Sequence, residues 1–307
     1  MSLSKPLSIA AGGKTAVLLF RVHRRLRGIR SAGLEGSLVT LGSLIDKTIA
    51  ILRRDLLIAV RYRSGFVITA AGSLAQLAAF YYLARAVGPS FRPDGLDYFP
   101  FVLVGTGLFS FLISGMNSFV QIVQEAQQAG TLEILMSTST PGPVLLFLSA
   151  LSALTGHTLR LLFYLGAGLF LFGVSARTLN IASCLTILGL SIMSAMSIGI
   201  VAAAVQLAIH KGSAVLWLFS SASWLTTGAL FPLTALPGPV RAVAQWIPLT
   251  HSLQGMRSAL LQGARLPSLL PEISVLALFS LVLLPSSLWL FSWTLRRARL
   301  QGTLSYY

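Results

Sequence analysis

The sequence has few charged residues, very few acidic ones and a single cysteine. Only 10% of its 307 residues are charged, whereas a soluble globular domain has about 25%, so an ordinary cytosolic enzyme is excluded. One cysteine, Cys184, cannot form an internal disulfide, and no group of Cys and His residues has metal-ligand spacing. We therefore expect no disulfide scaffold and no metal site. Apolar residues, by contrast, make up 55% of the chain, and the mean hydropathy is +0.80.

Charge is unevenly distributed along the chain. Lys and Arg outnumber Asp and Glu by 23 to 8, which gives a formal net charge of +15. On a soluble protein this excess would suggest a nucleic-acid partner. Twelve of the cations, however, lie before Ser64, and three more cluster at Arg296, Arg297 and Arg299. This distribution is typical of an integral membrane protein and predicts membrane lipids, not nucleic acid, as partners.

Six apolar stretches are long enough to cross a membrane. A bilayer core of about 30 Å requires roughly 20 consecutive, mostly apolar residues in a helix. We therefore expect an all-α integral membrane protein with a six-span domain over 64–295. The spans are predicted at about 64–87, 98–121, 151–174, 180–209, 213–232 and 272–295. The third span has a possible earlier start at Pro143, because the apolar run begins there.

The Lys and Arg residues of the short flanking segments predict the orientation. With the N-terminus in the cytoplasm, 16 cations lie inside, and six lie outside in longer loops. We expect a multi-pass protein of the cytoplasmic (inner) membrane with both termini in the cytoplasm. Residues 296–307 are its C-terminal tail, and residues 1–43 are a basic, flexible tail attracted by anionic lipid.

Residues 44–62 have the pattern of an amphipathic helix. Apolar residues recur at three- and four-residue spacing from Leu44 to Val60, and charged residues from Asp46 to Arg61 fall on the opposite side. Such a helix is too charged to span a membrane. It is predicted to lie in the plane of the membrane interface.

One motif near the N-terminus imitates a nucleotide site. Gly13-Lys14-Thr15 matches the end of a phosphate-binding loop, but the pattern requires Gly where this chain has Ser8, and no apolar strand precedes it. No ATP site is predicted in this chain.

Polar residues recur at helical spacing in the second span, and hydroxyls recur in the fifth. In the second span they are Ser110, Ser114, Asn117, Ser118, Gln121 and Gln124. In lipid such groups face protein or water, so they indicate either helix packing or a pathway for cargo. The candidate pathway residues are Ser114, Asn117, Gln121, Ser223 and Thr227.

Two ionisable residues inside the predicted spans stand out, His157 and Arg160, near the predicted start of the third span. Either they snorkel to the inner headgroups, or they contact the headgroup of a substrate. None of the eight carboxylates lies in the middle of a span. This argues against an ion-driven carrier, which usually needs an acid at depth.

The segment after the second span predicts a docking helix. It reads Glu125-Ala-Gln-Gln-Ala-Gly130-Thr131-Leu132-Glu133, and Pro141 and Pro143 end it. Such a short amphipathic helix on the cytoplasmic side, without catalytic residues, is suited to contact a partner.

The loop between the fifth and sixth spans is too apolar to be solvated, and prolines interrupt it from Pro232 to Pro248. Backbone that is not helical at membrane depth must be buried in protein or line a cavity. We therefore predict short half-helices within the outer leaflet.

These two segments, in this order, resemble those of ABC-2 type transporter permeases. The first is an E-x(n)-G-T-L-E pattern followed by a proline, which is matched by Glu125, Gly130 to Glu133 and Pro141. The second has the form F-P-x-x-x-L-P…N-P-L-T/x…R-x-x-L-x-G, and this chain has Ile247 in place of the Asn. Its matches are Phe231, Pro232, Pro237, Pro248 and Arg257. The likeness covers about 44–295 and is greater to drug and lipo-oligosaccharide exporters than to long-polymer exporters.

The resemblance implies a transport subunit without an ATP site of its own. Two permease copies, in a homodimer or a heterodimer, would bind two separate ABC ATPase subunits that hold ATP and Mg. Residues 44–62 would be the connector helix. Glu125, Gly130, Thr131, Leu132 and Glu133 would couple the permease to the ATPase. The expected cargo is a drug, a lipid or a lipid-linked glycan.

Two other classes of function remain open at this point. One is an intramembrane lipid-modifying enzyme that uses His157, Arg160 or His251. The other is an ion-coupled secondary carrier.

Overall fold

The computed structural model describes residues 63–130, 142–174 and 179–301, and within these residues the regular structure is helical, without strands. All the described residues belong to one compact unit. The predicted basic tail 1–43 and the predicted interfacial helix 44–62 lie outside the described residues.

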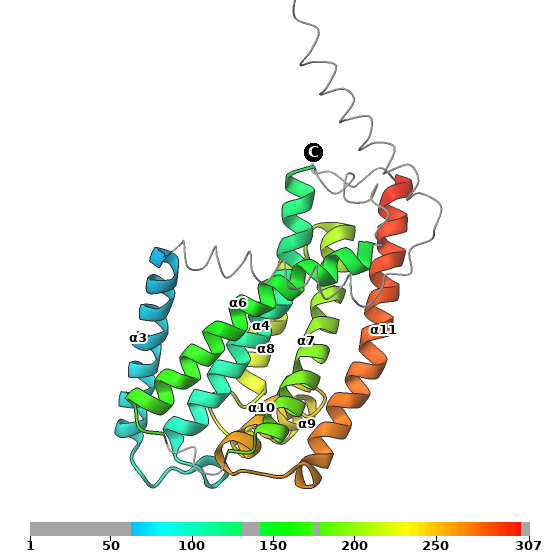
Figure 1. Cartoon of the computed structure of the whole chain (residues 1–307). Coiled ribbons are helices and arrows are strands. Elements are labelled where there is room, and N and C mark those ends of the chain that lie inside the picture. Colours follow the sequence, from blue (N-terminus) through cyan, green and yellow to red (C-terminus); the bar gives the residue numbers. More distant parts are fainter. Residues whose placement is uncertain (1–62, 131–141, 175–178, 302–307) are drawn as a thin grey trace, which may run out of the picture. The chain divides into compact units, whose positions relative to one another are not determined.

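Five helices of the described chain are long and apolar enough to cross a membrane (Figure 1). They are α3 (Arg63–Val87), α4 (Tyr98–Gln128), α6 (Gly142–Leu171), α7 (Ile181–Ile209) and α11 (Leu270–Gln301). They overlap the predicted first to fourth spans and the sixth. The prediction of an all-α membrane protein is confirmed.

Helix α8 (Gly212–Thr226) covers only part of the predicted fifth span, 213–232. Its 15 residues rise about 22 Å, which is less than the roughly 30 Å of a bilayer core. The helix stops because Gly228 has a φ of +77° and Pro232 follows. The sixth crossing stays a prediction.

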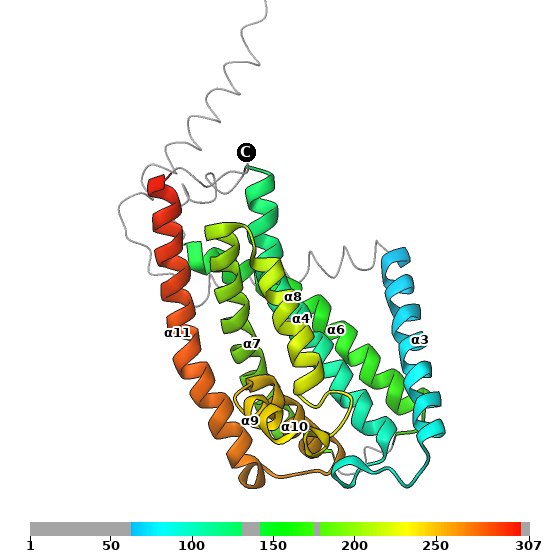
Figure 2. The same cartoon turned by 180° about the vertical axis from the view of Figure 1, so that it is seen from behind.

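Short helices fill the connection from α8 to α11. They are η2 (Leu233–Ala235), α9 (Gly238–Ala244), α10 (Pro248–Leu261) and η3 (Leu266–Leu269). Pro248 is the first residue of α10, and Pro237 directly precedes α9. Proline suits these positions because its fixed φ is helical and an N–H there would lack a helical partner. Helix α10 packs against α4, α7 and α11, as Figure 2 shows from behind.

Helices α4 and α7 form the centre of the bundle. Helix α7 packs against α4, α8, α10 and α11, while α4 also packs against α6 and α3. The largest fully buried side chains include Phe101 and Phe119 of α4 and Ile187 and Ile200 of α7. The other long helices expose large apolar side chains, such as Phe170 of α6 at 89% and Leu300 of α11 at 88%. Lipid is the environment that such a surface requires.

The contact between α7 and α4 depends on Gly199. A Cβ at this position would lie 2.8 Å from Cδ2 of Phe119 and 3.0 Å from backbone atoms of Met116. Neither the buried ring nor the helix backbone has room to shift. A hydrogen atom is therefore the largest substituent that fits.

We predict that Gly199→Ala lowers the free energy of unfolding by about 1–3 kcal/mol, the usual effect of overpacking. Gly189→Ala is the matched control, because it lies on the same helix and a Cβ added there would have no atom within 4 Å. That control should be neutral or slightly stabilising, since Ala favours helix over Gly. Thermal unfolding in mild detergent measures both variants, and equal midpoints would contradict the prediction.

Candidate functional site

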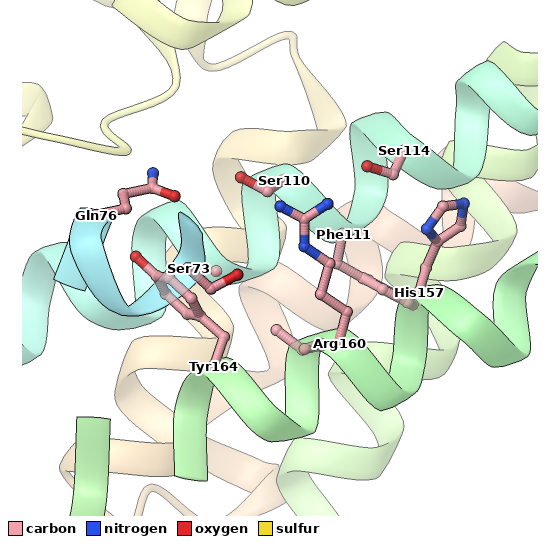
Figure 3. A pocket seen from close by; sticks show the side chains of 10 residues that line it. Ser73, Gln76, Ser110, Phe111, Ser114, His157, Arg160 and Tyr164 are labelled. Atoms are coloured by element: carbon pink, nitrogen blue, oxygen red, sulfur yellow. The ribbon is translucent and has the colours of Figure 1, made fainter. Parts of the chain in front are cut away.

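A small polar cavity lies where α3, α4 and α6 meet (Figure 3). Its volume is about 30 Å³, which is room for about two water-sized groups. The polar side chains that line it are Ser73 and Gln76 of α3, Ser110 and Ser114 of α4, and His157, Arg160 and Tyr164 of α6. Ser110 and Arg160 are exposed, so the cavity opens to the outside of the chain. Polar groups between membrane helices must be satisfied by protein, water or a ligand.

The face that α6 presents to the cavity follows from helical spacing. His157, Arg160, Leu161 and Tyr164 stand at positions i, i+3, i+4 and i+7, which share one side of a helix. In Figure 3 the guanidinium of Arg160 points toward Ser110 of α4. His157 and Arg160 were predicted from the sequence, whereas Tyr164, which this spacing identifies, was missed. Ser73 and Gln76 were also missed, because the apolar sequence of α3 gives no comparable signal.

Two hydrogen bonds hold this face of α6 against α4. The Oη of Tyr164 lies 3.0 Å from Oγ1 of Thr106, whose hydroxyl donates to the Val102 carbonyl at 2.7 Å. A hydroxyl has one proton, so Tyr164 is the donor to Thr106. Together with the contact of His157 described next, this bond fixes the orientation of two rings beside Arg160.

Ser118 and His157 form a contact that was not predicted from the sequence. Their Oγ and Nε2 atoms lie 3.0 Å apart, while the Ser118 hydroxyl donates to the Ser114 carbonyl at 3.0 Å. Nε2 of His157 is therefore the donor, and it is not placed to accept the serine proton as a catalytic base would. Neither α3 nor α6 contains a carboxylate that would orient His157 for such a role. The contact joins two helices.

Arg160 brings a positive charge to the cavity and has no acidic partner in the part of the chain that the structure describes. Helices α3 and α6 contain no Asp or Glu. The acid of α4, Glu125, lies about 16 Å along the helix from Ser114. The charge of Arg160 is thus not neutralised by the helices that form the cavity.

Helix α6 has the earlier of the two predicted starts, at Gly142, with Pro143 as its second residue. His157 and Arg160 consequently lie in the middle of the helix and not near its beginning. Arg160 is separated from Gly142 by about 27 Å of helix. An arginine side chain does not reach that far, so the guanidinium of Arg160 does not extend to the first turn of α6.

The five predicted pathway residues do not form one surface. Ser114 lines the cavity, whereas Asn117 donates to the Ile113 carbonyl of its own helix at 3.0 Å and Gln121 is exposed. Ser223 and Thr227 belong to α8 and its C-terminal end, and each is 1% exposed. Thr227 donates to the Ser223 carbonyl at 2.7 Å. Of these five described residues, Ser114 alone lies at the cavity.

The predicted docking segment begins where α4 ends. Glu125 is exposed in the last turns of α4, and Gly130 has a φ of +63°. This left-handed conformation after a helix end favours glycine. Thr131, Leu132 and Glu133 lie outside the described residues.

A buried hydrogen-bond chain connects the end of α4 to the turn between α7 and α8. Nε2 of Gln206 donates to Oε1 of Gln127 at 3.3 Å, and Oε1 of Gln206 accepts from the backbone N–H of Gly212 at 2.9 Å. Both glutamines are 1% exposed. A Cβ on Gly212 would overlap the Ala202 carbonyl oxygen, so glycine is required for this approach. The end of α4 is thereby hydrogen-bonded to α7 and to the start of α8.

Arg257 of α10 organises the second motif. Its Nε donates to the Phe101 carbonyl at 3.1 Å, and its Nη2 donates to the carbonyls of Gly228 and Ala229 at 2.8 and 3.0 Å. The guanidinium carbon also lies 3.5 Å from the centre of the Phe101 ring, a cation–π contact. Burial lowers the pKa of Arg257 to about 9, while Asp94 acts in the opposite direction. The side chain therefore stays charged at pH 7.

The remaining residues of this motif shape the chain around Arg257. Phe231 is half-buried and Pro232 is buried, and they follow the two carbonyls that Arg257 holds. Pro237 and Pro248 stand at the beginnings of α9 and α10. Between them, Arg241 donates to the carbonyls of Leu233, Thr234 and Leu236 at 2.7–3.2 Å. Two arginines thus satisfy the backbone of this irregular connection.

Comparison with known families gives one match over most of the chain. A family model described as ABC-2 type transporter matches residues 46–261. The match includes the docking segment and the motif from Phe231 to Arg257, and it confirms the resemblance stated from the sequence. A search of the curated proteins found no match.

We predict that Arg257→Met lowers the free energy of unfolding by about 2–4 kcal/mol, because it leaves buried carbonyls unsatisfied. Arg257→Lys should recover only part of this loss, since a lysine lacks the planar group that donates in two directions and stacks on Phe101. Arg265→Met removes an exposed cation nearby in sequence and serves as the control. Thermal unfolding in mild detergent compares the three variants, and a neutral Arg257→Met would refute this role.

Proposed function

Because the chain belongs to the ABC-2 type transporter family and is a multi-pass membrane protein, we propose that it is the permease subunit of an ATP-driven exporter. It moves an amphipathic substrate, such as a drug, a lipid or a lipid-linked glycan, outward across the cytoplasmic (inner) membrane. A separate ATPase subunit supplies the energy. We propose that this exporter is of the drug and lipo-oligosaccharide type.

The end of α4 carries this proposal. An exposed Glu125, the left-handed Gly130 and the Thr131-Leu132-Glu133 sequence follow one another at the end of a buried central helix. Through Gln127 and Gln206 that end is joined to α7 and α8. A partner that pushes on this segment therefore moves the centre of the bundle, which is what ATP-driven coupling requires.

The partners and the orientation follow from the same proposal. Permeases of this family generally pair with ABC ATPase subunits. Here two ATPases bind ATP and Mg on the cytoplasmic side and contact two permease copies, in a homodimer or a heterodimer. The excess of Lys and Arg near both termini supports placing both ends in the cytoplasm.

The two alternative functions have weaker support. An intramembrane enzyme would use His157. Its Nε2 donates to the Ser118 hydroxyl, however, whereas a catalytic base would accept the proton of a serine nucleophile. An ion-coupled carrier would use a carboxylate at depth. In the described helices the acids lie near the ends, as Glu125 does in α4 and Glu272 in α11.

We predict that a phosphate-loop ATPase copurifies in about equal amount with the tagged full-length chain. The measurement is a pull-down in mild detergent at native expression, followed by mass spectrometry. Gly130→Trp and Glu133→Arg should each reduce the recovered ATPase at least about tenfold, which corresponds to about 1.4 kcal/mol of binding free energy. The reason is that both changes alter the segment that docks on the ATPase.

Gly173→Trp is the matched control for Gly130→Trp. Gly173 also has a positive φ, +69°, and a Cβ added there would have no atom within 4 Å. It follows the C-terminal end of α6, far along the chain from the docking segment, so its substitution should not change the recovery of the ATPase. Absence of any ATPase, in cross-linked membranes as well as in detergent, would overturn the proposal. So would full recovery of the ATPase together with normal export in both docking-segment variants.

A further inference from the structure

The charge balance of the cavity between α3, α4 and α6 is incomplete. Arg160 is directed into it, and the three helices offer no acid nearby. A cation among membrane helices is costly unless it is paired. Within the described residues, the helices that form the cavity thus leave the positive charge of Arg160 available to an anion that enters it.

We propose that this cavity binds the anionic headgroup, a phosphate or a carboxylate, of an amphipathic molecule. The juxtaposed groups that support it are Arg160, the hydroxyls of Ser110 and Ser114, and the amide of Gln76. A planar guanidinium donates two parallel hydrogen bonds to an oxyanion, and the neighbouring hydroxyls and amide supply further donors. His157 and Tyr164 are held by α4 and frame the site.

The shape of the cavity indicates an amphiphile and not a free ion. About 30 Å³ admits only a few atoms, and the opening lies on the outer surface, where Ser110 and Arg160 are exposed. Leu159 and Leu162, on either side of Arg160 in the chain, are 45% and 62% exposed. A headgroup can therefore sit in the cavity while its apolar part lies against the surface of α6.

This inference rests on the proposed function only where it identifies the bound molecule with the cargo. Headgroup binding itself requires neither the ATPase nor nucleotide. A binding measurement on the purified chain contains neither, so its failure and the failure of ATPase copurification are separate results.

The test uses the purified full-length chain in nanodiscs of phosphatidylcholine. Fluorescent phosphatidic acid is titrated in as the anionic probe, and fluorescent phosphatidylcholine is the zwitterionic comparison. We expect saturable binding of phosphatidic acid. Arg160→Gln should weaken it by about ten- to a hundredfold, the effect of losing a charge-assisted contact. Arg160→Lys should retain part of the affinity.

Two controls separate the site from general electrostatic attraction. Arg265→Gln makes the same change of charge at an exposed position and should leave binding unchanged. Ser110→Leu fills the opening without changing the charge and should weaken binding as Arg160→Gln does. Circular dichroism and gel filtration establish that each variant is folded and monodisperse.

Three outcomes would overturn the proposal. Binding that is unaffected by both Arg160→Gln and Ser110→Leu places the lipid elsewhere. Equal losses in Arg160→Gln and Arg265→Gln show attraction by net charge alone. Competition by inorganic phosphate at the concentration of the lipid shows a site for small anions and refutes the choice of an amphiphile.

Discussion

The buried guanidinium of Arg257 is the interaction on which the connection from α8 to α11 depends. It joins three parts of the chain, namely α10, the start of α4 and the carbonyls at Gly228 and Ala229. The approach is possible only because Gly105 has no side chain, since a Cβ there would overlap the guanidinium and the Ala229 carbonyl oxygen. Without these donors the carbonyls would be buried and unpaired, at a cost that irregular backbone in a membrane does not tolerate.

A second polar link fixes the opposite ends of the central helices. Gln127 and Gln206 join α4 to α7, and Gly212 extends the link to α8. Arg257 holds the start of α4 and this pair holds its end. The helix that leads into the docking segment is therefore fixed to its neighbours at both ends. These contacts are the ones through which the proposed coupling would act on the bundle.

The long helices were predictable because length and apolar composition alone define them. Five of them overlap the predicted ranges, and Pro143 already marked the early start of α6. The end of α8 was not predictable in this way, since hydropathy continues past Gly228 while the backbone turns there. The pairs of Ser118 with His157 and of Thr106 with Tyr164 were also missed. They join residues far apart in sequence and depend on how α4 and α6 pack. Arg257 was recognised as part of a motif, but its three acceptors belong to segments that only the fold brings together.

Arg257 and Arg160 are both cations in an apolar domain, but they differ in what surrounds the guanidinium group. Arg257 is 4% exposed, and backbone carbonyls and an aromatic ring surround it. Its interactions are made by the chain itself, and its role is structural. Arg160 is exposed at a cavity, with hydroxyls and an amide around it but no acid on the helices α3 and α6 that help to form it. In the described residues, Arg257 therefore has partners for its donors, whereas the charge of Arg160 has no acidic partner. Arg160 is therefore where the proposed ligand would gain most by binding, because an anion would supply the charge that the described helices α3 and α6 lack.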